Sequence, residues 1–193
     1  MAKLRKNAVV HSASGKFGDL IVFRQLADGS TRIAQAPSSN PNRVKSSGET
    51  ANQKRFQRAI MYGQGAIADP ELRKQYQEAA DKKPLLSAYN VAVADFSKAP
   101  SIEQIDVSRY TGTPGDPIVI TATDDFKVAE VRVVISDPDG TIVDEGMAMQ
   151  DPSFKNVWQW VASKNNDLVK GDKIEVVATD IPGNITKAAE DLE

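Results

Sequence analysis

The stretch KVAEVRVVIS, residues 127–136, decides the fold of the second half of the chain. Val128, Val131, Val133 and Ile135 recur within it at nearly every second position. This period places one set of side chains on a single face of an extended strand. We therefore predict a half-buried β-strand here, which ends at the Asp-Pro-Asp-Gly turn that follows it.

Strand-like runs of the same kind surround this stretch and are separated by turn signals rich in Pro, Gly and Asp. Seven short antiparallel strands in about ninety residues are typical of an immunoglobulin-like β-sandwich. Trp158 and Trp160 stand two residues apart and so share a face, and we expect one of them to be the main core aromatic. The predicted runs are 102–110, 117–123, 127–136, 141–149, 156–162, 173–179 and 183–188.

The balance of charge changes where this β-rich half begins. Residues 1–100 carry 16 Lys/Arg and 8 Asp/Glu, a net +8, whereas residues 101–193 carry 8 and 18, a net −10. The sum is the near-neutral −2 of the whole chain. We therefore predict two domains of different architecture, a basic unit over residues 1–98 and an acidic sandwich over residues 101–193.

The basic unit is predicted to be α+β, with a β-hairpin followed by about three short helices. Asp28-Gly29, a strong hairpin signal, lies between the strand-like runs 19–26 and 31–36. A lone hairpin is marginal in water, so we expect it to pack on the helices or on a partner. Residues 37–49 hold two Pro and four Ser without an apolar period, which predicts an extended linker.

The starts and buried faces of the three helices can also be predicted. A capping box with Thr50 as N-cap opens the first helix, and Asp69 and Ser87 are the predicted N-caps of the second and third. Residues three or four apart share a helix face, so each helix should bury one apolar stripe. The predicted stripes are Phe56, Ile60, Gly63 and Ile67; Leu72, Tyr76 and Ala79 or Ala80; and Tyr89, Val93 and Phe96.

The chain lacks the residue sets of the common catalytic sites. It has no Cys, and His11 is the only His, so a zinc site lacks most of its ligands. A catalytic triad would need His11 as its base, but His11 stands in the basic start of the chain without an acidic neighbour. Gly15-Lys16 lacks the earlier Gly, the following Ser/Thr and the following helix of a phosphate-binding loop. We expect no enzyme activity, no catalytic residue and no cofactor.

The start of the chain is basic, and the apolar run after it, residues 8–10, is too short for a signal peptide. No stretch approaches the roughly 18 apolar residues of a membrane span. We therefore predict synthesis in the cytoplasm, from which the chain could be incorporated into a virion or a similar particle.

The stretch DKIEVVATDIPGNIT, residues 172–186, resembles the closing hairpin of bacterial immunoglobulin-like domains. Those domains carry a Thr-Asp-x-x-Gly-Asn turn between their last two strands. Residues 123–131 look like the Asp-x-x-Val segment with which one of their strands begins. The resemblance implies a module for adhesion, display or spacing, and no catalysis.

The first half loosely resembles a group of small uncharacterised bacterial and phage-type proteins. These open with a Ser-Gly-Lys-x-Gly turn and a strand, followed by a helix with Gln, Arg and Phe and a helix with Ser-x-Tyr-Asn. The matching segments here are residues 14–19, 22–24, 53–56 and 87–90. The resemblance implies a structural or virion-associated role.

Four oxygen-bearing residues, Asp124, Asp125, Asp180 and Asn184, stand in two turns that could lie at the same end of a sandwich. Oxygen ligands of this kind can hold Ca²⁺. Asp and Asn are also ordinary turn residues, because their side chains bond to the nearby backbone. We predict no metal site and keep calcium at these four residues as the open alternative.

The basic half supports two functional hypotheses. In the one we favour, the chain is a non-enzymatic structural protein: its basic half docks on a neighbouring subunit or particle, and its immunoglobulin-like domain projects outward. In the alternative, the basic half contacts nucleic acid with an affinity that falls steeply with salt. A third interpretation is that both charged surfaces only keep the protein soluble. The residues predicted to contact nucleic acid or an acidic partner are Lys3, Arg5, Lys6, Lys16, Arg24, Arg32, Arg43, Lys45, Lys54, Arg55 and Arg58.

Overall fold

The computed structural model describes residues 2–4, 13–26, 28–37, 43–82 and 86–192. The chain divides into two compact units, Met1–Ser47 and Gly48–Glu193, and the boundary between them falls inside the predicted linker. The predicted domain limits, 1–98 and 101–193, follow the change in secondary structure near Pro100. The second compact unit spans that change and contains both the helices and the strands of the β-rich half.

The first unit contains one antiparallel sheet of four strands, in the order β1-β4-β3-β2. The predicted hairpin is confirmed, because β3 pairs with β4 and Gly29 takes the positive φ of +72° that its turn requires. The segment around Lys16, interpreted from sequence as a turn, is instead a short edge strand. The strands are β1 (Ala2–Leu4), β2 (Gly15–Phe17), β3 (Ile21–Gln25) and β4 (Thr31–Gln35).

The second unit begins with three helices, α1 (Ser47–Ala68), α2 (Pro70–Ala80) and α3 (Ala88–Phe96). Two predicted N-caps are confirmed: the Asp69 carboxylate accepts from two N–H groups of α2, and the Ser87 hydroxyl accepts from one of α3. The third prediction is wrong, because α1 begins three residues before Thr50. None of the described helices is long and apolar enough to cross a membrane.

Small residues make the close contact between α1 and α3. The most buried positions of α1 are Ala59, Gly63 and Ala66, whereas Phe56, predicted to lie on the buried stripe, is 58% exposed. A Cβ on Gly63 would lie 2.7 Å from the side chain of Val93, so only glycine fits this crossing without a shift. The predicted stripe of α3, Tyr89, Val93 and Phe96, therefore contacts α1, although these three side chains are only half-buried. The fully buried face of α3 is Ala88, Val91, Ala92 and Asp95.

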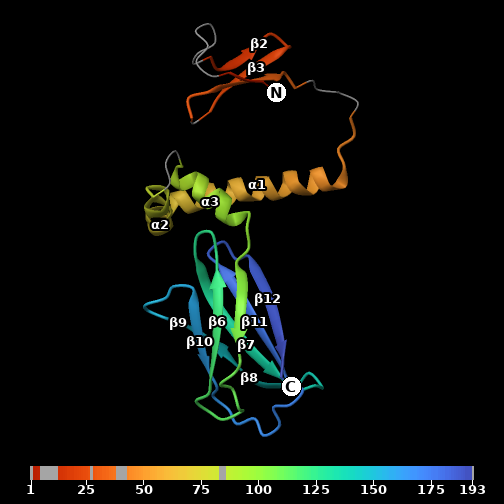
Figure 1. The fold of residues 1–193 in the computed structure, drawn as a ribbon, viewed down its shortest axis with the longest axis vertical. Helices are drawn as coiled ribbons and strands as arrows, with labels where there is room; N and C mark the ends of the chain where they lie inside the picture. The colour runs from red at the N-terminus through yellow and green to blue at the C-terminus, as the bar shows by residue number, and fades with distance from the viewer. Residues whose placement is uncertain (1, 5–12, 27, 38–42, 83–85, 193) are drawn as a thin grey trace. The chain divides into compact units, whose positions relative to one another are not determined.

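Eight strands follow and form two antiparallel sheets that share one core (Figure 1). Their orders are β5-β6-β10-β9 and β12-β11-β7-β8. Each predicted run overlaps a strand, and the run 141–149 overlaps two, separated by Ala148. The strands are β5 (Ser101–Asp106), β6 (Pro117–Thr123), β7 (Val128–Ser136), β8 (Ile142–Met147), β9 (Met149–Gln150), β10 (Val157–Val161), β11 (Lys173–Asp180) and β12 (Ile185–Asp191). The largest differences in bounds are at β5, which ends at Asp106 and not at residue 110, and at β12, which ends at Asp191 and not at residue 188.

Alternating side chains from both sheets fill the core, which gives a β-sandwich-like arrangement. Every second residue of β6 and β11 is buried. Trp158 and Trp160 are 5% and 3% exposed, so both tryptophans belong to the core, where we expected one to be the main core aromatic. The largest fully buried aliphatic residues are Ile118 and Ile120 from one sheet and Val131, Val133, Ile135, Ile174 and Val176 from the other.

A β-bulge explains why the apolar alternation in β7 skips from Val128 to Val131. Thr179 of β11 pairs with Glu130, but the next residue, Asp180, pairs with Val128, which leaves Ala129 as an extra residue on β7. Bulges bend a strand and redirect the side chains beside them. The bulge thus lies directly beside Asp180, at the end of the sandwich where the helices attach.

A buried carboxylate in the sandwich allows a test of this core. Asp144 is 1% exposed and accepts hydrogen bonds from the N–H and hydroxyl of Ser163 and from the N–H of Lys164 and Glu145. We expect Asp144→Asn to lower the free energy of unfolding by about 1–3 kcal/mol, because an amide can accept at only one atom. Urea unfolding measures this change.

The same variant should change the response to acid. Burial would raise the pKa of Asp144, but these hydrogen bonds hold it below its ordinary value. A carboxylate with a lowered folded-state pKa stabilises the fold above the unfolded pKa of about 3.9 and loses this effect as pH falls through the folded value. Asp144→Asn should therefore weaken the loss of stability below about pH 4. Asp191→Asn, at an exposed position of β12, is the control, and equal effects of the two variants would contradict the prediction.

Candidate functional site

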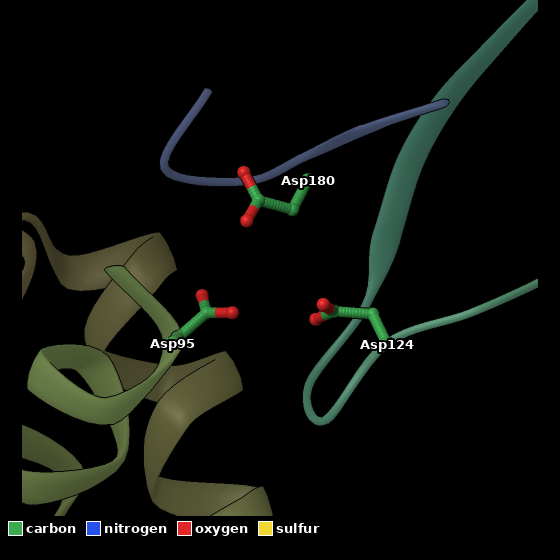
Figure 2. Close-up of side chains that lie close together, drawn as sticks. All are labelled: Asp95, Asp124 and Asp180. Carbon is green, nitrogen blue, oxygen red and sulfur yellow. The ribbon is translucent and has the colours of Figure 1, made fainter. Parts of the chain in front are cut away.

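Three carboxylates from distant parts of the second unit meet at the junction between helices and sandwich. Asp95 lies near the end of α3, Asp124 in the turn after β6, and Asp180 at the end of β11. One oxygen from each lies within 4.8 Å of the other two (Figure 2). Asp95 and Asp180 are 1% and 2% exposed, and Asp124 is half-buried.

Local hydrogen bonds hold each carboxylate in place. The Tyr76 hydroxyl donates to Oδ2 of Asp95 at 2.6 Å. Asp124 closes its own turn, because its Oδ2 accepts from the N–H groups of the second and third residues that follow, both at 2.9 Å. Asn184 donates to Asp180 twice, from its backbone N–H at 2.6 Å and from its side-chain amide at 2.7 Å.

These hydrogen bonds leave two buried oxygens without a partner. Oδ1 of Asp95 and Oδ1 of Asp124 accept no hydrogen bond from any described residue. An unpaired buried acceptor costs free energy, and more so when it is charged. The described residues therefore do not satisfy all the hydrogen-bond acceptors of the cluster.

The cluster also concentrates negative charge. Burial raises the pKa of Asp95 to about 7, together with the charges of Asp124 and Asp180, although the hydrogen bond from Tyr76 acts in the opposite direction. Burial likewise raises the pKa of Asp180, despite the hydrogen bonds from Asn184. Such a group can share a proton with its neighbours or bind a cation.

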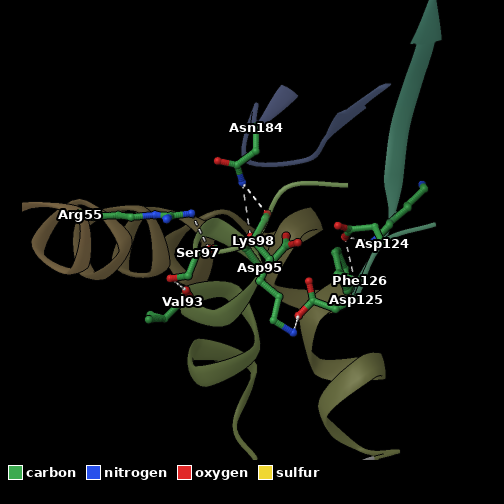
Figure 3. A network of polar contacts seen from close by, with 10 residues as sticks. Arg55, Val93, Asp95, Ser97, Lys98, Asp124, Asp125, Phe126 and Asn184 are labelled. Atoms are coloured by element: carbon green, nitrogen blue, oxygen red, sulfur yellow. Dashed lines mark hydrogen bonds and ion pairs between the residues drawn. The ribbon is translucent and has the colours of Figure 1, made fainter. Parts of the chain in front are cut away.

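A network of contacts ties the sandwich to the end of α3 around this cluster (Figure 3). The Asn184 amide donates to the carbonyl of Lys98 at 2.9 Å and lies 3.3 Å from the carbonyl of Phe96. The Lys98 ammonium lies 3.0 Å from the Asp125 carboxylate. These carbonyls stand at the negative end of the α3 dipole, which adds to the negative potential of the carboxylates.

Aromatic packing completes the junction. The Phe126 ring, from the turn after β6, stacks on the Tyr76 ring with centroids 4.3 Å apart. The hydroxyls of Tyr62 and Tyr76 are 2.7 Å apart, so one hydrogen bond joins α1 to α2. A groove of about 580 Å³ runs between α2 and this end of the sandwich, and Asp124 is among its lining residues. The other two carboxylates of the cluster do not line this groove, so Asp124 is the member of the cluster that borders it.

Two of the four residues in the open calcium alternative are brought together as that alternative requires, namely Asp124 and Asp180. Asp125 instead pairs with a lysine, and Asn184 directs its amide nitrogen at the cluster. Sequence reasoning missed Asp95. Its position offered a signal, because it lies four and three residues after Val91 and Ala92 and so on the buried face of α3.

The predicted basic contact residues are divided between the two units. In the first sheet, Lys16 lies opposite Val22 and Arg24 lies opposite Arg32, so these three basic side chains share one face. Within α1, Arg55 donates to the Ser97 carbonyl at 2.6 Å. Lys3 lies in β1, Arg43 and Lys45 precede α1, Lys54 and Arg58 lie exposed on α1, and Arg5, Lys6 and His11 lie outside the described residues.

No protein-family model matches the chain, and no curated protein is similar to it in sequence. Several solved structures are similar to the chain, and three of them cover about half of it. CopC from Methylosinus trichosporium OB3b is 14% identical with a TM-score of 0.36, over 48% of this chain and 90% of that one. A tetra-tandem repeat from the extending region of a large adhesion protein is 22% identical with a TM-score of 0.32, over 49% of this chain. An engineered protein is 16% identical with a TM-score of 0.34, over 54% of this chain.

The chain spans about a quarter of the last two structures, 23% of the adhesion repeat and 26% of the engineered protein. The resemblances to bacterial immunoglobulin-like domains and to phage-type proteins stay predictions.

The junction makes a prediction about Phe126. We expect Phe126→Ala to lower the free energy of unfolding by about 2–4 kcal/mol, because it empties the space over Tyr76. Helical circular dichroism should then be lost at a lower urea concentration than the tryptophan fluorescence signal of the sandwich core. Phe154→Ala is the matched control, since Phe154 is 63% exposed, and it should change stability by less than about 0.5 kcal/mol. Equal stabilities of the two variants would contradict this role for Phe126.

Proposed function

We propose that this chain is a non-enzymatic assembly module, in which the first unit docks on a neighbouring copy of the chain and the second unit, an immunoglobulin-like sandwich with attached helices, is the part displayed. The observation that carries the proposal is the amphipathic character of the first sheet. A virion or a virus-derived particle is a setting in which such a module would serve.

One face of the first sheet is apolar. Its register places Phe17 opposite Ile21 and Phe23 opposite Ile33, so these four side chains lie on the same face. Phe17 is 73% exposed, and the other three are half-buried. A sheet normally buries such a face against a second layer. Among the described residues of this unit, the buried ones are only Ser30, Thr31 and Ala36.

The charges favour a second copy of the chain as the partner. Residues 1–47 carry 8 Lys/Arg and 2 Asp/Glu, a net +6, whereas residues 48–193 carry 16 and 24, a net −8. The basic unit of one copy is therefore attracted to the acidic unit of another, which steers association. The apolar face then supplies the area that holds the contact.

Light scattering on the full-length protein at physiological salt tests this proposal. We expect a mass that is a multiple of the 20.9 kDa of one chain. Phe17→Glu should shift the population to monomer, because it places a charge on the apolar face without removing a buried side chain. Val44→Glu, the same kind of change at an exposed position of the first unit outside its sheet, should leave the mass unchanged. A monomeric native protein, or a multimer that Phe17→Glu leaves intact, would contradict the proposal.

The opposite face of the same sheet favours the second candidate function, contact with nucleic acid. Arg24 and Arg32 stand directly opposite each other, and like charges paired in this way destabilise a sheet unless a partner neutralises them. If the face binds phosphates, single-stranded or duplex DNA should bind at low salt and be released as salt rises. The double variant Arg24→Glu and Arg32→Glu should weaken this binding at least about tenfold, while Arg73→Glu on α2 should not. Absence of binding at low salt would exclude this function.

A further inference from the structure

We infer that Asp95, Asp124 and Asp180 form a binding site for one calcium ion, which joins the end of α3 to two turns of the sandwich. The inference concerns the second unit alone, and it stands whether or not the first unit drives assembly.

The spacing of the oxygens suits a single ion. Ca²⁺ binds oxygen at about 2.3–2.6 Å, so two oxygens on the same ion lie at most about 4.6–5.2 Å apart. One carboxylate oxygen from each of the three residues lies within 4.8 Å of the others. One calcium ion could therefore contact all three carboxylates with only small movements of their side chains.

The unpartnered oxygens point to a missing ligand independently of this spacing. Oδ1 of Asp95 accepts no hydrogen bond from the described residues, although Asp95 is only 1% exposed. Oδ1 of Asp124, a half-buried residue, is also buried and accepts no hydrogen bond from the described residues. Figure 2 shows the Asp95 and Asp124 carboxylates facing each other across the space that Asp180 closes. The other oxygens of the two residues are already held by Tyr76 and by the turn after β6.

Among the residues that the structure describes, no lysine or arginine forms an ion pair with any of the three carboxylates. Two cations of the surrounding network have other partners: Lys98 pairs with Asp125, and Arg55 donates to the Ser97 carbonyl. Three carboxylates that are this close and this buried need a compensating positive charge.

The donors select calcium among the common metal ions. All are hard carboxylate oxygens, which suit Ca²⁺ and Mg²⁺ and not the softer transition metals. Mg²⁺ demands a near-ideal octahedron and gives up its water reluctantly, whereas Ca²⁺ accepts an irregular set of ligands. The groove beside Asp124 would supply water for the remaining positions, since calcium takes six to eight ligands.

Calcium titration of the full-length protein, after treatment with a chelator, tests the inference. Calorimetry should show one site per chain. At calcium concentrations about 100-fold above the dissociation constant, the melting temperature should rise by about 5–10 °C. A protein that neither binds calcium nor melts at a higher temperature in about 10 mM calcium, roughly tenfold above the dissociation constants of the weakest natural sites, would overturn the inference.

Two variants locate the site. Asp95→Asn removes one ligand charge and should reduce calcium affinity at least about tenfold. In chelator it should melt at the same temperature as the native chain or higher, because it relieves repulsion between buried carboxylates. A lower calcium affinity together with an unchanged or higher melting temperature in chelator would show that a ligand is lost. A damaged fold would lower both the affinity and the melting temperature. Asp125→Asn is the matched control, since it removes the same charge from the same turn without touching the cluster.

Three further outcomes would overturn the assignment. Equal losses of affinity in Asp95→Asn and Asp125→Asn would mean that only the general acidity of the surface attracts the ion. Calcium binding by Asp95→Asn with unchanged affinity would place the ion elsewhere. An equal rise in melting temperature with magnesium would show that the site does not select calcium.

Discussion

The central packing contact between the helices and the sandwich is the stacking of Phe126, from a sandwich turn, on Tyr76 of α2. Tyr76 is fully buried, and its hydroxyl continues the contact to Asp95 of α3. A single tyrosine therefore joins two helices to the sandwich. Helices of 11 and 9 residues are marginal in water, so α2 and α3 depend on this shared core for their stability.

The same contact also brings the three carboxylates of the cluster together at the junction, where their negative charges repel one another. It fixes Asp95 from one side and the turn that carries Asp124 from the other, while Asn184 holds Asp180 between them. Burying like charges at this spacing is costly unless something compensates them. A bound calcium ion would turn this cost into a link between three distant segments. Such a link would suit an assembly module, because a displayed domain must keep its orientation on the elements that carry it.

Local sequence signals predicted much of this fold. Alternation gave the strands of the sandwich, and Asp69 and Ser87 marked two helix starts, because each signal acts within a few residues. The start of α1 was misplaced, since Glu49 suits the first turn of a helix that begins earlier. Strands β1 and β2 were not predicted, because a strand of three residues is too short to show a period.

The sequence predicted two of the three carboxylates of the site. Asp124 and Asp180 stand in recognisable turns, but Asp95 joins them only through packing between distant segments.

Hydrogen exchange of the full-length protein, followed by mass spectrometry with calcium and with chelator, tests the cross-link most directly. Exchange reports the local opening of backbone hydrogen bonds. If calcium joins the three segments, protection should rise together at the end of α3, in the turn after β6 and in the turn between β11 and β12, with little change in the sandwich core. Unchanged exchange in all three segments, or protection of one of them alone, would contradict the account.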